Sequence, residues 1–142
     1  MPQKLVIEGD QPAKFILLGE DDEDDREMLK DAFVTIDQSL VVLFVNNGME
    51  ILSALDKLPE ESMPCLIVLD YNMPGMNGAD ILKEINSNGR YDNIPRIVWS
   101  TSGAEKYKQN CLQLGAADYL IKPSTDEDLL QMATYMLSIC TV

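Results

Sequence analysis

The sequence predicts an α/β protein in which helices cover both faces of a parallel sheet. Two observations predict this fold class: short apolar runs of strand length with little polar alternation, and segments of helical apolar spacing between them. Strands buried on both faces are typical of parallel sheets, and right-handed crossovers place helices on either side. The chain has 142 residues, 46% of them apolar, which suits one domain around one core.

The candidate strands are five apolar runs. They are Phe15–Gly19, Leu40–Val45, Cys65–Leu69, Arg96–Ser100 and Asp118–Ile121. We therefore expect one domain over residues 14–142, with residues 1–13 as an amino-terminal extension. The segment "KLVIEGDQPAK" in that extension is either a short extra strand or a frayed tail, and the tail is favoured.

The candidate helices lie after each run, and each carries one apolar stripe. The stripes are Met28, Leu29, Ala32, Phe33, Ile36; Ile51, Leu52, Leu55, Leu58; Ile81, Leu82, Ile85; Tyr107, Cys111, Leu114; and Leu129, Ala133, Met136, Cys140. Such stripes are typical of amphipathic helices packed on a sheet. Asp22 with Asp25 predicts a cap on the first helix, and Ser124 with Glu127 predicts a capping box on the last.

Charge and composition argue against several function classes. The net charge of -13 repels phosphate backbones and anionic lipids, so we expect no direct nucleic-acid or membrane partner. The chain contains no histidine, which excludes Ser-His-Asp and Cys-His catalysis and histidine-bound zinc. No apolar run approaches the roughly 20 residues that span a bilayer, and the first residues lack a signal-peptide core. The chemistry must therefore rest on carboxylates, hydroxyls and lysine.

The three cysteines are interpreted as reduced thiols. Cys65, Cys111 and Cys140 are odd in number, far apart and embedded in apolar runs, which favours buried thiols over a disulfide framework. This interpretation predicts a cytoplasmic location.

Polar side chains follow the predicted strands at their carboxyl ends, where open α/β sheets bind ligands. Glu20 and Asp21 follow the first run, Asp70 the third, Ser100 ends the fourth and Lys122 follows the fifth. If the first and third strands are neighbours, three carboxylates crowd together and need a cation, for which Mg²⁺ is the natural candidate. Asp70 then remains available to attack phosphorus, with the ammonium of Lys122 and the hydroxyl of Ser100 binding phosphoryl oxygens.

Each of these features also has a purely structural interpretation. An acidic run from Asp22 to Asp25 is usually a solvated patch that suits the positive end of a helix dipole, and we keep that interpretation for these residues. Asp70 alone is compatible with an Asx turn before Pro74, and Tyr119 with an ordinary core aromatic. Asp70, Ser100 and Lys122 are assigned to a site because all three stand at the carboxyl ends of predicted strands.

Four segments carry a family resemblance. In order, "ILLGEDDEDD", "VLDYNMPGMNG", "IVWSTS" and "LGAADYLIKP" resemble the motifs of response-regulator receiver domains, and the chain is similar to single-domain, chemotaxis-type members. The resemblance implies a flavodoxin-like fold with five helices and strand order 2-1-3-4-5. It also implies that Glu20 and Asp21 are the acidic pair of a Mg²⁺ site, Asp70 the phospho-acceptor, and Asn72 the residue whose backbone carbonyl joins the metal.

The resemblance assigns further roles near the carboxyl terminus. Ser100 matches the switch hydroxyl, Tyr119 the switch aromatic and Lys122 the phosphate-binding lysine, while Asn72 and Ser102 flank the phosphoryl group and tune dephosphorylation. It also implies a cis peptide between Lys122 and the proline that follows it.

Two residues depart from the family pattern. Gly19 replaces an aliphatic residue, which is expected to loosen the loop that follows it, and Trp99 is large for its strand position.

The function implied is that of a single-domain response regulator in two-component phosphorelay signalling. It accepts a phosphoryl group on Asp70 from a histidine kinase or a histidine phosphotransfer protein, and it is a phospho-acceptor with autophosphatase activity rather than an enzyme. A downstream protein is expected on the face formed by the fourth helix, fifth strand and fifth helix.

Three alternatives stay open. The chain is also compatible with a phosphorelay intermediate and with an interaction module that works without phosphorylation. A haloacid-dehalogenase-like phosphatase fits poorly, because Asn72 stands where that class needs a second aspartate, and Glu20 and Asp21 precede the nucleophile.

Overall fold

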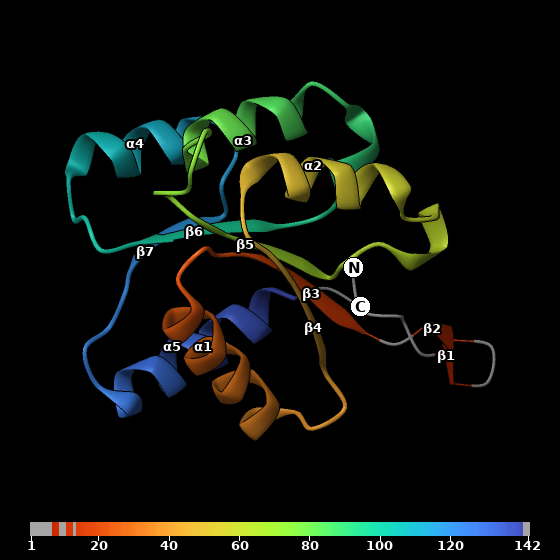
Figure 1. Cartoon of the computed structure of the whole chain (residues 1–142), viewed down its shortest axis with the longest axis horizontal. Coiled ribbons are helices and arrows are strands. Elements are labelled where there is room, and N and C mark those ends of the chain that lie inside the picture. Colours follow the sequence, from red (N-terminus) through yellow and green to blue (C-terminus); the bar gives the residue numbers. More distant parts are fainter. Residues whose placement is uncertain (1–6, 9–10, 13, 141–142) are drawn as a thin grey trace.

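A five-stranded parallel sheet forms the centre of the protein, which we describe from a computed structural model over residues 7–8, 11–12 and 14–140 (Figure 1). Its strands are β3 (Phe15–Gly19), β4 (Val41–Val45), β5 (Leu66–Asp70), β6 (Arg96–Ser100) and β7 (Asp118–Ile121). Their spatial order is β4-β3-β5-β6-β7. When β3 is counted as the first strand of this sheet, this is the predicted order 2-1-3-4-5, which is confirmed. Three strands have the predicted bounds, β4 begins one residue later, and β5 is shifted by one residue so that it ends on Asp70.

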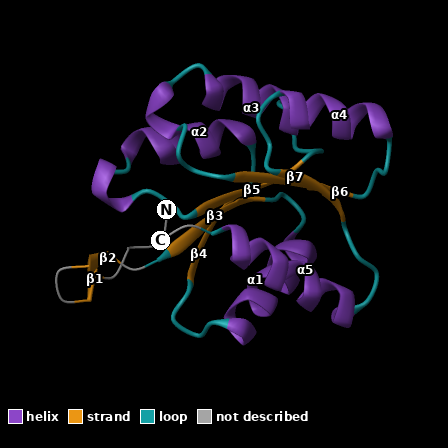
Figure 2. Cartoon of the chain, turned by 180° about the vertical axis from the view of Figure 1, so that it is seen from behind, coloured by secondary structure: helices purple, strands orange, loops and turns teal. Residues whose placement is uncertain are grey.

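Helices cover both faces of this sheet. They are α1 (Glu23–Ile36), α2 (Gly48–Lys57), α3 (Gly78–Asn86), α4 (Glu105–Gln113) and α5 (Asp126–Ile139), with short 3-10 turns at Glu60–Ser62 and Gly89–Tyr91. The helices α1 and α5 lie on one face, and α2, α3 and α4 lie on the other (Figure 2). Each helix layer packs against the sheet and forms a separate hydrophobic core with it. The doubly wound arrangement therefore follows from strands that are buried on both faces.

The predicted capping residue is correct for α1 and is one residue too early for α5. Asp22 caps α1 through its Oδ1, which accepts a hydrogen bond from the backbone N–H of Asp25 at 3.0 Å. The cap predicted at Ser124 is wrong, because Thr125 caps α5 by accepting from the N–H of Asp128 at 3.1 Å. Both hydroxyl residues stand three positions before an acidic residue, so the sequence pattern does not choose between them.

The apolar stripe predicted for α1 is only partly buried. Leu29, Ala32 and Phe33 are in the core, but Met28 and Ile36 at the two ends of the stripe are exposed. Met28 lies beyond the edge of the arc that faces the sheet, whereas Ile36 lies on the same side as Leu29 but is the last residue of the helix.

The amino-terminal extension contains a small two-stranded ribbon. Strand β1 (Ile7–Glu8) pairs antiparallel with β2 (Gln11–Pro12), so these residues are not the tail that the sequence favoured. The rest of the predicted extension lies outside the described residues. Among the described residues, none of the helices is long and apolar enough to cross a membrane.

The interpretation of all three cysteines as thiols is wrong for two of them. Cys65 and Cys140 form a disulfide with a Cα–Cα distance of 4.9 Å across a sequence separation of 75. Cys65 directly precedes β5 and Cys140 caps the end of α5, so helix packing brings together two residues that sequence spacing does not connect. Cys111 stays free and buried, and burial raises the pKa of its thiol to about 11.

Candidate functional site

Three carboxylates meet at the carboxyl ends of β3 and β5. Glu20 directly follows β3, Asp70 is the last residue of β5, and Gly19 pairs with Leu69 in the register of these neighbouring strands. Glu20, Asp21 and Asp70 each offer an oxygen, and these oxygens lie within 4.8 Å of one another. Glu20 and Asp70 are buried and Asp21 is exposed, so the cluster is open to solvent on one side only.

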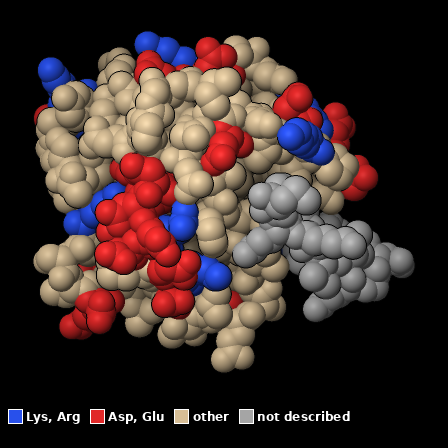
Figure 3. All heavy atoms as spheres, viewed as in Figure 1, with Lys and Arg blue, Asp and Glu red and all other residues tan. Residues whose placement is uncertain are grey.

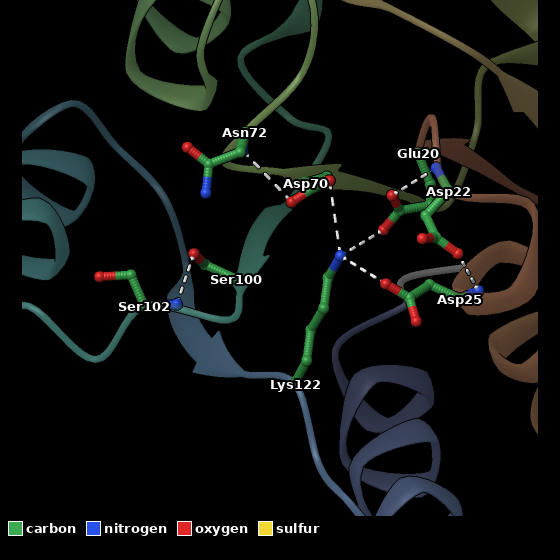
Figure 4. Close-up of polar contacts among 8 residues, drawn as sticks. All are labelled: Glu20, Asp22, Asp25, Asp70, Asn72, Ser100, Ser102 and Lys122. Atoms are coloured by element: carbon green, nitrogen blue, oxygen red, sulfur yellow. Dashed lines mark hydrogen bonds and ion pairs between the residues drawn. The ribbon is translucent and has the colours of Figure 1, made fainter.

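Lys122 enters the cluster from the end of β7 (Figure 4). Its Nζ lies 2.8 Å from Glu20 Oε1, 2.9 Å from Asp25 Oδ2 and 3.4 Å from Asp70 Oδ2, and its side chain is only 10% exposed. The backbone N–H of Lys122 donates to the carbonyl of Ser100 at 2.8 Å, which fixes the start of the lysine side chain beside β6. One ammonium group is therefore shared among three carboxylates.

Asp25 is a member of this site that the sequence analysis missed. It was assigned to a solvated patch, which is wrong for this residue because its carboxylate hydrogen-bonds to Lys122 Nζ at 2.9 Å. Its neighbours Asp22 and Asp24 are exposed, as expected for such a patch. Figure 3 shows acidic side chains gathered over the beginning of α1. The only sequence signal for Asp25 is its place in the first turn of the helix that follows Glu20.

Burial governs the electrostatics of the cluster. It raises the pKa of Glu20 to about 8, although the bond to Lys122 opposes this shift. It also raises the pKa of Asp70. For Lys122, burial disfavours the charged form, but the bonds to Glu20 and Asp25 outweigh it and raise the pKa. The ammonium stays charged at neutral pH, while the two buried carboxyl groups still lack enough positive charge to ionise together.

The carboxylates fit a divalent cation. Glu20 Oε2 accepts a hydrogen bond from the N–H of Asp22 at 3.0 Å. Glu20 Oε1 is buried, and its partner among the described residues is the ammonium of Lys122 at 2.8 Å, which Asp25 and Asp70 share, so Oε1 keeps a lone pair for a metal ion. Hard cations such as Mg²⁺ and Mn²⁺ prefer such oxygen ligands. A divalent ion would satisfy Oε1 and offset the charge of Asp21 and Asp70.

The predicted hydroxyl and amide residues lie around Asp70 on the side away from Glu20 (Figure 4). Ser100 ends β6 and is fully buried, and its Oγ accepts a hydrogen bond from the N–H of Ser102 at 3.0 Å. The side chain of Asn72 is exposed, and its backbone N–H donates to Asp70 Oδ1 at 3.2 Å. The structure thus places Asn72, Ser100 and Ser102 next to the phospho-acceptor candidate or on the loop that borders it.

Tyr119 points inward from β7 and holds the loop after β6. Its hydroxyl donates to the carbonyl of Ser102 at 2.8 Å. Its ring meets that of Tyr71, the residue after Asp70, edge to face at a centroid distance of 6.3 Å. The predicted switch aromatic therefore contacts both the loop that carries Ser102 and the end of β5.

Three further expectations concern the Lys122–Pro123 bond, Trp99 and Gly19, and the first of them is wrong. The described chain contains no cis peptide bond, so the bond between Lys122 and Pro123 has the trans form that X–Pro bonds ordinarily favour. Trp99 lies under the ammonium of Lys122, which is 4.8 Å from the ring centroid. Gly19 is closely packed, because a Cβ there would lie 2.9 Å from Ile51 Cδ1.

Comparison with known proteins agrees with this geometry. The family model "Response regulator receiver domain" matches residues 16–134. Chemotaxis protein CheY1 of Helicobacter pylori is 32% identical over 96 residues, which cover 68% of this chain and 75% of that protein. Two plant two-component response regulators also match, and the chain spans 44% and 41% of their length.

Solved structures agree as well. The phosphorylated cyanobacterial phytochrome response regulator RcpA is similar with a TM-score of 0.79 and 31% identity, covering 90% of this chain and 96% of that one. The Mn²⁺-bound form of response regulator Rcp1 has a TM-score of 0.77 and 30% identity, covering 88% and 92%. The family match over most of the chain, the strand order and the strand-end carboxylates agree, and the chain belongs to the response regulator receiver domain family.

Proposed function

We propose that this chain acts as a response-regulator receiver domain that accepts a phosphoryl group on Asp70. One observation carries the proposal: a buried aspartate at a strand end belongs to an acidic cluster that fits a cation and lies 3.4 Å from a lysine ammonium. The donor is a phosphohistidine on a histidine kinase or a histidine phosphotransfer protein. The chain itself contains no histidine, so the phosphohistidine must belong to the partner.

The chemistry is a transfer between two activated phosphoryl bonds. An oxygen of Asp70 attacks phosphorus, the P–N bond of the phosphohistidine breaks, and its electron pair stays on the imidazole, which takes up a proton. Lys122 and the hydroxyl of Ser100 bind oxygens of the transferred group and offset its charge. Hydrolysis of the resulting acyl phosphate by water is the autophosphatase step, and Asn72 and Ser102 border its path.

The cation proposed for the site is Mg²⁺. Glu20, Asp21, Asp70 and the backbone carbonyl of Asn72 would hold it, and when bound it supplies positive charge at the phosphoryl oxygens. The buried Glu20 Oε1, whose partner among the described residues is an ammonium shared with two other carboxylates, supports a cation at this position. The related structure of Rcp1 was obtained with Mn²⁺, an ion with similar ligand preferences.

Phosphorylation is proposed to reach a protein partner through Tyr119. The path runs from the phosphoryl group to Ser100, to the loop of Ser102 and to the Tyr119 hydroxyl that bonds this loop. The adjoining α4–β7–α5 face exposes Ile121 and Tyr135, which are 56% and 41% exposed. Large exposed apolar residues support a protein-binding role for this face, and the acidic charge argues against nucleic acid or a membrane.

Acetyl phosphate tests the acceptor directly. Intact-protein mass spectrometry should show one added phosphate on the wild type in Mg²⁺, and none in excess chelator. Asp70→Asn should stay unmodified in both conditions, while Asp80→Asn, which alters a helix-capping carboxylate elsewhere, should be modified like the wild type. Modification of Asp70→Asn at the wild-type level would overturn the proposal.

A further inference from the structure

The ammonium of Lys122 lies closer to the α1 side of the site than to the phospho-acceptor. Its distances to Glu20 and Asp25 are 2.8 and 2.9 Å, against 3.4 Å to Asp70. Asp25 is outside the group of carboxylates that fits a metal ion, so its contact with Lys122 has no explanation in cation binding.

Both ends of this contact are fixed to the fold. Asp25 lies in the first turn of α1, where its backbone N–H donates to the capping carboxylate of Asp22. Lys122 is anchored through its backbone to Ser100 on β6, and its ammonium lies over the ring of Trp99. The bond between Asp25 and Lys122 therefore joins α1 to the end of β7 across a sequence separation of 97 residues.

An ammonium group has three N–H donors, and three carboxylates already surround this one. Phosphorylation replaces the contact with the Asp70 carboxylate by one with the phosphoryl group, and a bound cation would compensate the buried charge of Glu20. Asp25 lies outside the group that fits the cation, so it remains as the partner that competes with the phosphoryl oxygens for Lys122. The side chain of Asp25 is 27% exposed, so water can rehydrate it. Asp25 is the partner that is released most readily.

We propose that Asp25 is a positioning residue that holds Lys122 in a resting position and competes with the phosphoryl group for its ammonium. This competition rests on the proposed function, because it requires a phosphoryl group on Asp70. The competition makes the phosphorylated state less stable than it would be in a site without Asp25. It also couples the beginning of α1 to the presence of a phosphoryl group on Asp70.

Trp99 provides a readout, since it is the only tryptophan of the chain and lies 4.8 Å from Lys122 Nζ. Binding of beryllium fluoride, a phosphoryl mimic, is titrated in saturating Mg²⁺ at fixed ionic strength. Asp25→Asn keeps the size of the side chain and the backbone cap, and it should bind the mimic about fivefold to tenfold more tightly than the wild type.

Asp24→Asn is the matched control. It removes the same charge from the same turn at an exposed residue, with no ion pair to Lys122 in the described structure. Its affinity for the mimic should stay within about twofold of the wild type. Equal effects of Asp24→Asn and Asp25→Asn would overturn the proposal, because general charge repulsion would then explain both.

Two further comparisons separate this proposal from the proposed function. In a Lys122→Met background, Asp25→Asn should change the affinity no further, and a persisting gain would contradict competition for the lysine. Without any mimic, Trp99 emission should differ between Asp25→Asn and the wild type but not for Asp24→Asn, and unchanged emission in Asp25→Asn would refute the resting bond. If the wild type does not bind the mimic but the emission difference is present, the proposed role of Asp70 as phospho-acceptor is refuted. The resting bond between Asp25 and Lys122 is then still supported.

Discussion

Asp70 and Glu20 are carboxyl residues buried at the edge of the sheet, where water solvates their charges poorly. Burial raises the pKa of both, and Lys122 is the one cationic side chain among the described residues that lies within 3.4 Å of each. The residues that make the site reactive therefore weaken the fold when no cation is bound.

Replacing the phospho-acceptor should consequently stabilise the cation-free protein. We expect Asp70→Asn to be more stable than the wild type by about 1 kcal/mol in chelator at neutral pH, since it removes a buried charge. Mg²⁺ at ten times its dissociation constant should add about 1.4 kcal/mol to the wild type and narrow the gap. Urea titrations at constant ionic strength measure both effects. A mutant less stable than the wild type in chelator would mean that the contact of Asp70 with Lys122 outweighs the effect of burial.

The pKa of Glu20 predicts a pH dependence of stability. Burial raises it from its ordinary value of 4.5 to about 8, so between these values the folded chain binds a proton that the unfolded chain has released. In chelator, this contribution to stability is complete below pH 4.5 and is lost as the pH rises through about 8. The wild type should therefore lose stability over this window relative to Glu20→Gln.

Urea unfolding at a series of pH values in chelator measures this difference. Glu23→Gln, an exposed residue three positions away, is the control and should follow the wild-type curve. Parallel curves for the wild type and Glu20→Gln would show that Glu20 ionises in the folded chain as it does in the unfolded one.

At the scale of elements, α4 has few buried side chains, and one of its contacts with the rest of the fold is an aromatic stack. The residue before it, Ala104, has no side-chain oxygen to cap it, and Cys111 is its single buried residue. Tyr107 on α4 stacks on Tyr71 at a centroid distance of 4.8 Å, and Tyr71 in turn meets Tyr119. A helix with so little other support suits a part of the molecule that repacks on phosphorylation.

Removal of the stacked ring should loosen α4 selectively. Tyr107→Ala is expected to lower the free energy of unfolding by about 1 to 2 kcal/mol and to speed amide hydrogen exchange in α4 more than in α3. Tyr135→Ala, which removes a ring from α5 outside this stack, should leave exchange in α4 unchanged. Equal acceleration in α3 and α4 would indicate a general loss of stability instead.

Strand and helix patterns predicted the elements well because each depends on nearby residues. The apolar runs located the five strands of the parallel sheet within one residue, since no polar alternation competes with them. The start of α5 failed because Ser124 and Thr125 present the same spacing to an acidic residue, and only the backbone around Thr125 selects the cap. Local patterns thus predict that an element exists more reliably than where it begins.

At the scale of the whole molecule, the sequence predicted the part of the site that depends on topology alone. In a parallel sheet all strands end at the same edge, so the convergence of Glu20, Asp70 and Lys122 follows from their positions after strands. The bond of Asp25 to Lys122 and the Cys65–Cys140 disulfide depend on how α1 and α5 pack on one face. No spacing in the sequence encodes those distances, and both were missed.

The disulfide between Cys65 and Cys140 leads to a prediction about the stability of the whole chain. It ties the end of α5 to the start of β5 and closes a loop over a sequence separation of 75. Such a crosslink stabilises the fold chiefly by restricting the unfolded chain, by up to about 4.5 kcal/mol for a loop of this length. Cys140→Ser should therefore lower the free energy of unfolding by about 2 to 4 kcal/mol under oxidising conditions.

Reductant should lower the free energy of unfolding of the wild type to that of Cys140→Ser, and it should leave the free energy of unfolding of that variant unchanged. Cys111→Ser is the control, because the thiol of Cys111 is free in the described structure. The stability of this variant should depend on reductant as that of the wild type does. Thiol titration of the denatured, unreduced protein should count one free cysteine per chain. A count of three, with stability indifferent to reductant, would mean that Cys65 and Cys140 pack side by side as thiols and that apolar contacts alone hold the last turn of α5 against the sheet.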